Sequence, residues 1–186
     1  SKPTIRDMKR LKRLGRYLIG RTRCVHSFMY QDLCSSMSTW TDSDHAGCKI
    51  TRKSTSAGVC MLGSHVIKSW SSTQGVISMS SGEAEYYGLV KGGSISLGMK
   101  SIFGEMGMNV GINIYTDASA AVGIASRRGL GKVRHIEVNQ LWPQEKVASK
   151  EICIHKVDGT ENLSDVLTKY VNGDSIMYHM KHTSQH

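Results

Sequence analysis

Ser56-Ala57-Gly58-Val59-Cys60-Met61-Leu62 and His65-Val66-Ile67-Lys68-Ser69-Trp70 stand on either side of the dipeptide Gly63-Ser64. Both segments are apolar and as short as strands, and the dipeptide suits the two-residue turn of a β-hairpin. Segment 80–106 follows without a proline and opens with Ser-Ser-Gly-Glu, in which a serine can cap a helix ahead of a glutamate. A hairpin followed by a long helix indicates a mixed α/β fold.

The other predicted elements lie on both sides of this hairpin. Strands are expected over 25–30, 38–42, 111–116 and 151–155, and helices over 4–19, 80–106, 118–126 and from 162 to 169. The interior of the 80–106 helix holds Gly88, Gly92, Gly93 and Gly98, each costing roughly 1 kcal/mol relative to alanine, so we expect it to pack closely on a sheet. A chain of 186 residues without repeats suits one domain, or one domain with an appendage.

Positive charge is concentrated at the N-terminus. The chain has 24 Lys and Arg against 15 Asp and Glu, and residues 1–23 hold nine basic residues but only one acid, Asp7. That segment therefore carries +8 of the net +9. Because Ile5, Met8 and Leu11 recur at helical spacing, two interpretations stay open: a helix packed on the body with a solvated basic face, or an arm that contacts phosphates.

The cysteines and the hydropathy exclude two classes of protein. Five scattered cysteines without a CxxC pair argue against a disulfide framework or a zinc ribbon, and a reducing intracellular compartment (cytoplasm, nucleus or organelle matrix) is expected. No apolar run approaches the ~18 residues of a membrane span. Since the chain begins at Ser1 rather than Met, we expect a fragment or a processed product.

Four acidic residues lie where predicted strands end or predicted helices begin: Asp42, Glu85, Asp117 and Asp165. In mixed α/β sheets, ligands bind at the carboxyl ends of strands, so Asp42 and Asp117 would share a site if their strands are neighbours. Clustered carboxylates need a cation, and hard oxygen ligands suit Mg²⁺ or Mn²⁺. Two such ions could activate a water and stabilise the leaving oxygen of a phosphodiester. Taken singly, on spacing alone, each acid is more often a cap or a turn residue than a metal ligand.

Six strings follow one another between residues 41 and 169: Thr41-Asp42-Ser43-Asp44-His45-Ala46-Gly47, Arg52-Lys53-Ser54-Thr55-Ser56-Ala57-Gly58, Trp70-Ser71-Ser72, Ser80-Ser81-Gly82-Glu83-Ala84-Glu85-Tyr86, Arg134-His135-Ile136-Glu137 and Asp165-Val166-Leu167-Thr168-Lys169. In order and spacing they resemble the ribonuclease H domain of copia-type LTR retrotransposon polyproteins. Residues 11–18 also resemble the segment that joins reverse transcriptase to that domain. The resemblance implies an RNase H-like α/β fold, a five-stranded mixed sheet flanked by helices, here with a basic N-terminal helix. It also implies metal-dependent cleavage of the RNA strand of RNA–DNA hybrids.

The resemblance assigns a site as well. It implies that Asp42, Glu85, Asp117 and Asp165 are catalytic and hold two Mg²⁺ or Mn²⁺ ions. Asp44 stays a second candidate because its side chain shares a strand face with that of Asp42. Glu85 is preferred to Glu83 because Ala-Glu-Tyr resembles the family's metal-binding glutamate. His155 precedes Asp165 by ten residues, a spacing similar to that of the histidine that helps to move protons or release product in cellular and retroviral RNases H.

We expect three parts: a basic connection segment over 1–36 (a helix and a short strand), the RNase H-like domain over 37–172, and a polar tail over 173–186 with exposed histidines. Eight basic residues are expected to bind nucleic acid or a partner: Lys9, Arg10, Arg13, Arg16, Arg127, Arg128, Lys132 and Arg134. Two positions depart from the family pattern. Pro143 either opens a restarted helix or marks a segment that has drifted, and Tyr170 replaces the usual proline.

Two functions of different classes follow. The first is a retrotransposon-derived ribonuclease H, an endonuclease whose partners are an RNA–DNA hybrid and, within a polyprotein, reverse transcriptase. The second is a recruited domain that serves as a non-catalytic structural subunit among protein or RNA partners of a larger assembly. Other nucleases of the superfold, such as integrase-like enzymes, use fewer acids and do not explain the order of the motifs.

Overall fold

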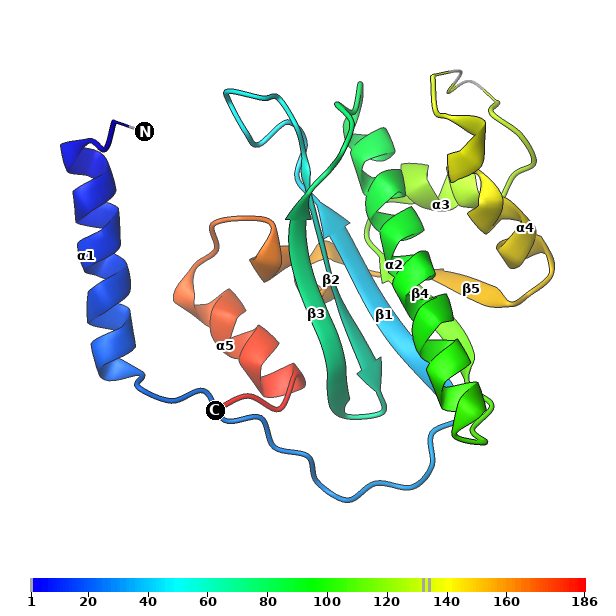
Figure 1. Cartoon of the computed structure of the whole chain (residues 1–186), viewed down its shortest axis with the longest axis horizontal. Coiled ribbons are helices and arrows are strands. Elements are labelled where there is room, and N and C mark those ends of the chain that lie inside the picture. Colours follow the sequence, from blue (N-terminus) through cyan, green and yellow to red (C-terminus); the bar gives the residue numbers. More distant parts are fainter. Residues whose placement is uncertain (1, 132, 134) are drawn as a thin grey trace.

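A five-stranded mixed sheet forms the centre of the computed structural model, which describes residues 2–131, 133 and 135–186 (Figure 1). The strands are β1 (Ser36–Ser43), β2 (Thr55–Leu62), β3 (His65–Thr73), β4 (Gly111–Thr116) and β5 (Ile152–Lys156), arranged in the order β3-β2-β1-β4-β5. β1, β2 and β3 pair antiparallel, β4 runs parallel to β1, and β5 runs parallel to β4. The predicted five-stranded mixed sheet is confirmed, and so is the hairpin, whose turn residue Gly63 has a φ of +59°.

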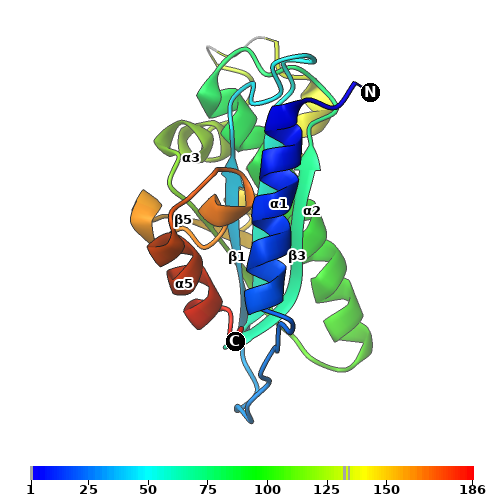
Figure 2. The same cartoon turned by 90° about the vertical axis from the view of Figure 1, so that its left-hand side faces the viewer.

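Helices cover both faces of this sheet. α2 (Ser81–Glu105), α3 (Ser119–Ala125) and α4 (Trp142–Ala148) enclose the main core, and α5 (Gly173–His182) lies on the opposite side of the sheet from α2 (Figure 2). The main core contains large apolar side chains from sheet and helices, including Met37, Tyr86, Leu89, Ile112, Ile114 and Ile152. No helix within the described residues is both long and apolar enough to cross a membrane.

The glycines of α2 allow the helix to approach β1 very closely. A Cβ added at Gly92 would lie 2.4 Å from Thr41 Cγ2, and one added at Gly88 would lie 2.6 Å from Ser43 Oγ. Gly93 is similarly close to Trp142, at 3.0 Å, whereas Gly98 has no neighbour within 4 Å. The helix thus compensates for its poor intrinsic propensity by close packing, as we expected.

A short strap over 162–169 crosses the face opposite α2. Leu163 and Leu167 pack with Val59, Met61 and Trp40 in a second, smaller core. The Asn162 side chain donates to the carbonyl oxygen of Thr41 at 3.1 Å, which ties the strap to β1. The strap therefore holds its polar residues beside the end of β1.

The N-terminal helix α1 (Ile5–Gly20) stands away from the body, and its whole surface is exposed (Figures 1 and 2). A capping box between Thr4 and Asp7 begins the helix. Its apolar side is uncovered, with Ile5, Met8 and Leu11 exposed by 81%, 54% and 61%. The interpretation of α1 as a helix packed on the body is therefore wrong, because the extended segment that follows α1 carries it away from the sheet.

Three local predictions are also wrong. The expected strand over 25–30 forms only an isolated bridge between His26 and Gln185, because the segment that pairs with it, residues 184–186, supplies only three backbone hydrogen bonds. The expected helix from 162 to 169 is a 3₁₀ turn over Asp165–Leu167, and the last helix is α5. The tail is consequently helical in part, and His179 is buried, with its Nδ1 2.7 Å from the carbonyl oxygen of Leu163.

Three further points of the sequence analysis concern Pro143, Tyr170 and the division of the chain into parts. Pro143 lies in the first turn of α4, so the helix restarts there, the first of the two alternatives. Tyr170, at the position where the sequence departs from the pattern that it resembles, is almost fully exposed. The division into parts at residues 36 and 172 remains a prediction.

Candidate active site

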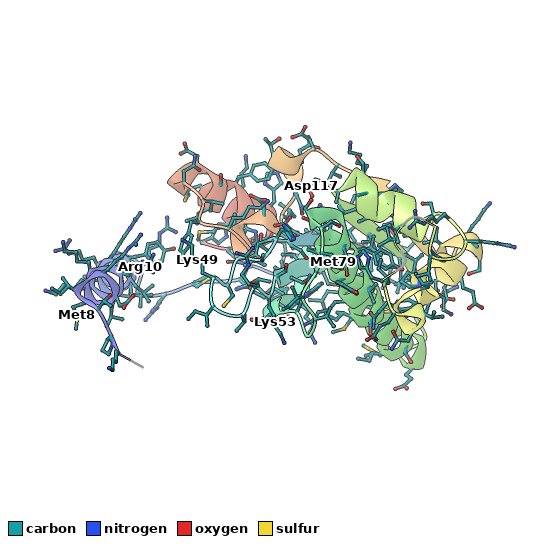
Figure 3. The ribbon with its side chains drawn as sticks, turned by 90° about the horizontal axis from the view of Figure 1, so that it is seen from above. Met8, Arg10, Lys49, Lys53, Met79 and Asp117 are labelled. Carbon is teal, nitrogen blue, oxygen red and sulfur yellow. The ribbon has the colours of Figure 1, made fainter. Side chains whose placement is uncertain are left out.

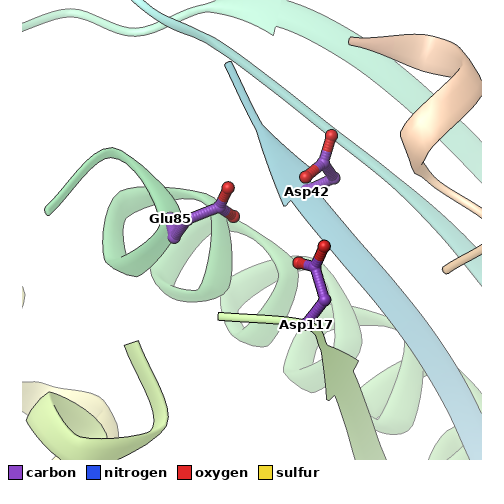
Figure 4. Close-up of side chains that lie close together, drawn as sticks. All are labelled: Asp42, Glu85 and Asp117. Carbon is purple, nitrogen blue, oxygen red and sulfur yellow. The ribbon is translucent and has the colours of Figure 1, made fainter. Parts of the chain in front are cut away.

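Three carboxylates converge at one edge of the sheet. Asp42 lies near the end of β1, Glu85 lies in the second turn of α2, and Asp117 directly follows β4. One oxygen of each lies within 4.8 Å of the others, and Figure 4 shows the three groups pointing toward one another. The residues come from three elements that are far apart in the sequence.

Strand register and helix packing explain this convergence. Trp40 and Tyr115 are cross-strand partners in the parallel pair of β1 and β4, so Asp42 and Asp117 both follow two residues later on the same face. Glu85 reaches them because Gly88, one turn further along α2, has no side chain to keep the helix away from Ser43.

Burial dominates the electrostatics of the cluster. Asp42 is completely buried, and this desolvation raises the pKa of its carboxyl group. Burial, followed by the charges of Asp42 and Asp117, raises the pKa of Glu85 from 4.5 to about 9. With its pKa at about 9, Glu85 keeps its proton at neutral pH unless a cation compensates its charge.

The donor set fits a hard divalent cation. Among the atoms that the structure describes, Asp42 Oδ1 and Glu85 Oε2 are buried and have no hydrogen-bond partner. Unpaired buried carboxylate oxygens are costly unless an ion or water satisfies them. Because all the donors are oxygens, Mg²⁺ or Mn²⁺ suits the site better than a metal that prefers sulfur or nitrogen.

The fourth predicted acid, Asp165, lies beside this cluster and outside the group of three. Its carboxylate accepts a hydrogen bond from Lys169, and its charge contributes to raising the pKa of Asp42. The Lys169 ammonium also lies 3.5 Å from Asp42 Oδ2, and the Thr168 hydroxyl donates to that same oxygen. The sequence analysis gave no role to Thr168 or Lys169, although the i,i+4 spacing of Asp165 and Lys169 was a usable signal.

Two alternative acids have other partners. Asp44 Oδ1 accepts a 2.6 Å hydrogen bond from the backbone of Thr55 and so closes the loop between β1 and β2. Glu83 pairs with His135 at 2.6 Å and accepts a hydrogen bond from the Met79 backbone at 2.8 Å. Neither acid belongs to the group of three carboxylates.

His155 occupies the open face of the sheet. Its ring stacks on Tyr115 with a centroid distance of 5.1 Å, and Tyr115 stacks in turn on Trp40 at 5.0 Å. His155 Nε2 lies 3.0 Å from Asn113 Oδ1. Because Tyr115 precedes Asp117 by two residues on the same face, His155 stands about 7 Å along the strand direction from the level of the acids.

The expected basic contacts fall into two places. Lys9, Arg10, Arg13 and Arg16 are exposed on α1, and Figure 3 shows Arg10 and Met8 on different sides of that helix. In the loop after α3, Arg128 is exposed, whereas Arg127 donates to the carbonyl oxygen of Leu130 at 2.6 Å. Lys132 and Arg134 lie outside the described residues.

A basic loop that the sequence analysis missed joins β1 to β2. Lys49 and Arg52 are exposed there, and Lys53 donates to the carbonyl oxygen of Gly75 at 2.7 Å (Figure 3). This loop directly follows the strand that carries Asp42.

A cleft of about 640 Å³ opens beside the acids, between the strap and α5. Asp117, Asp165 and Lys169 line it on the side of the cluster, and Asp174 and Tyr178 line it from α5. The acidic group is thus reached from solvent through a cleft whose charges are mostly negative.

No protein-family model matches the chain. The chain is similar to the "Retrovirus-related Pol polyprotein from transposon TNT 1-94" of Nicotiana tabacum, with 28% identity over 163 residues, which are 87% of this chain and 12% of the polyprotein. It is also similar to an uncharacterized mitochondrial protein of Arabidopsis thaliana, with 39% identity over 88 residues, which are 47% of this chain and 36% of that protein.

Solved ribonuclease H structures are among the similar folds. The N-terminal RNase H domain of a Mycobacterium tuberculosis protein has a TM-score of 0.48 and 15% identity, covering 79% of this chain and 97% of that one. LC11-RNase H1 in complex with an RNA/DNA hybrid has a TM-score of 0.47 and 13% identity, covering 71% and 93%. The resemblance that the six motifs indicate is thereby confirmed by sequence: the chain is a homologue of a copia-type retrotransposon Pol polyprotein and corresponds to a small part of its length.

Proposed function

We propose that this chain is a ribonuclease H domain that hydrolyses the RNA strand of RNA–DNA hybrids with two Mg²⁺ or Mn²⁺ ions. The observation that carries this proposal is the convergence of Asp42, Glu85 and Asp117, with two of their oxygens buried and unpaired. When bound, two such ions supply an activated water and neutralise the charge on the leaving oxygen.

The residues of the chain have distinct tasks in this proposal. Asp42, Glu85, Asp117 and Asp165 hold the ions, and the hydrogen bond from Thr168 keeps one oxygen of Asp42 in a fixed orientation. His155 assists proton movement or product release from its place on the sheet face. Because it stacks on Tyr115 and lies beside Asn113, it acts at a distance from the ions and does not bind them.

Basic residues in two places, the loop after β1 and helix α1, would hold the substrate. The loop after β1 brings Lys49 and Arg52 close to the strand end that bears Asp42, and α1 adds an exposed basic surface. Contacts of this kind go to phosphates and position a nucleic acid without reading its sequence. Selection of RNA over DNA would depend on contacts to 2′-hydroxyl groups.

The exposed apolar side of α1 favours a protein partner in addition. The side chains of Met8, Leu11 and Leu18 are each more than half exposed. An amphipathic helix usually buries such an apolar side against another protein surface. Within a polyprotein the partner would be the reverse transcriptase portion. In the alternative function, a non-catalytic structural subunit, it would be a protein or RNA component of a larger assembly.

Cleavage of a labelled RNA–DNA hybrid tests the enzymatic proposal. We expect cleavage of the RNA strand with Mg²⁺ or Mn²⁺ and none with EDTA. Asp117→Asn should abolish it, while Asp32→Asn, an equivalent change at an exposed residue of the segment after α1, should not. If the folded wild-type chain does not cleave with either metal, or if Asp117→Asn cleaves at the wild-type rate, the enzymatic proposal is wrong and the subunit function is favoured.

A further inference from the structure

We propose that Lys169 is an internal counter-ion of the acid cluster, which holds Asp42 and Asp165 in the metal-free protein and withdraws when divalent cations bind. The proposal rests on the proposed metal site and adds a determinant of its metal affinity. Lys169 is a positioning residue in this account, because it acts on the metal ligands and not on the substrate.

The contacts of Lys169 place its charge between two of the predicted ligands. Its ammonium donates to Asp165 Oδ1 and lies 3.5 Å from Asp42 Oδ2. Within residues 2–131, 133 and 135–186, no other salt bridge reaches any of the four acids. In the metal-free protein, the Lys169 ammonium thus partly neutralises the negative charge of Asp42 and Asp165.

The influence of this charge extends across the cluster. Partial burial alone would lower the pKa of Lys169, but its hydrogen bond to Asp165 and the charges of Asp42, Asp165 and Asp117 outweigh burial, and its pKa is raised. The positive charge of Lys169 in turn lowers the pKa of Asp42 and of Glu85, against the rise that burial causes. A fixed positive charge that stabilises the ionised acids also repels an arriving cation.

Lys169 can leave the acids without disturbing the fold. Its side chain is 46% exposed, whereas that of Asp42 is fully buried, so the lysine is the partner that is free to move. Its backbone remains bound to the carbonyl oxygen of Asp165 at 3.2 Å. Asp174 of α5 lines the same cleft, so a further carboxylate shares the cleft with Lys169.

Calorimetric titration of the whole chain with Mn²⁺ alone, without substrate, tests this proposal. Lys169→Met removes the charge and keeps an unbranched side chain, and we expect it to bind Mn²⁺ about tenfold more tightly than the wild type. Lys169→Arg should stay close to the wild type. Lys181→Met makes the same change of net charge at an exposed residue of α5 and should leave the affinity unchanged.

Thermal unfolding gives a second readout that a merely structural lysine would not produce. Lys169→Met should unfold at a lower temperature than the wild type in EDTA, and saturating Mn²⁺ should remove that difference. Lys169→Gln, which can still donate to Asp165, replaces the methionine variant if the latter does not fold without metal.

The outcomes separate this inference from the proposed function. If the wild type binds no Mn²⁺, both are wrong. If the wild type binds Mn²⁺ but Lys169→Met binds it equally or more weakly, only the counter-ion proposal is wrong. The same holds if Lys169→Arg behaves like Lys169→Met, because the effect would then depend on the shape of lysine and not on its charge.

Discussion

Replacing Glu85 by glutamine should make the metal-free protein more stable at alkaline pH. An unfolded glutamate ionises near pH 4.5, whereas the folded Glu85 keeps its proton up to about pH 9. Between these values the folded state binds more protons than the unfolded state, so the free energy of unfolding falls as the pH rises. The limiting slope for one carboxyl group is about 1.4 kcal/mol per pH unit.

The limiting slope is an upper bound on the effect, because water and the neighbouring acids can rearrange around the ionised carboxylate of Glu85 and reduce its cost. Taking half to all of the limiting slope, Glu85 lowers the stability of the wild type by about 1.5–3 kcal/mol between pH 6 and pH 8. Glu85→Gln cannot ionise, so its stability should change less over the same range. Saturating Mn²⁺ should reverse the order, because the wild type keeps a ligand that the variant has lost.

Urea unfolding in EDTA at several pH values measures this difference. The fluorescence of Trp40, Trp70 and Trp142 reports on the sheet and on α4, and the variant is compared with the wild type at each pH so that other titrating groups cancel. Glu161→Gln, at an exposed position, is the matched control and should follow the wild type. Parallel curves for Glu85→Gln and the wild type between pH 5 and pH 9 would refute the electrostatic account of the cluster.

Three further results are expected. Deletion of residues 1–23 should flatten the salt dependence of nucleic-acid affinity, since each neutralised phosphate contributes ~0.9 to the slope on a duplex; an unchanged slope would show that α1 does not contact phosphates. Gly92→Ala should lower the free energy of unfolding by about 1–3 kcal/mol, because its Cβ would lie 2.4 Å from Thr41 Cγ2, whereas Gly98→Ala, which meets nothing within 4 Å, should not destabilise. His155→Ala should slow hybrid cleavage by about 10²-fold, the lower end for a proton-transfer group, without changing Mn²⁺ affinity in calorimetry; a full cleavage rate would leave His155 with a packing role only.

Local patterns in the sequence were sufficient for most of the elements. The hairpin around Gly63, the capped start of α2 and the spacing of apolar residues in α1 all depend on neighbours a few residues away, and all three appear in the structure. The motifs also indicated which four acids to consider. The strand expected over 25–30 did not form, because a strand extends only as far as another chain segment supplies hydrogen-bonding partners. Residues 184–186 pair with its first residues only.

Tertiary structure decided which acids meet. Asp42 and Asp44 share a strand face in the sequence pattern, yet only Asp42 reaches the cluster, since Asp44 is bound to the backbone of Thr55. The distance of Glu85 from β1 is set by the missing side chain at Gly88, and the ion pairs of Lys169 depend on how the strap crosses the sheet. Periodicity and capping record interactions within one element, whereas the convergence of charges depends on strand register and on the separation between helix and sheet, which the packing of the whole chain determines.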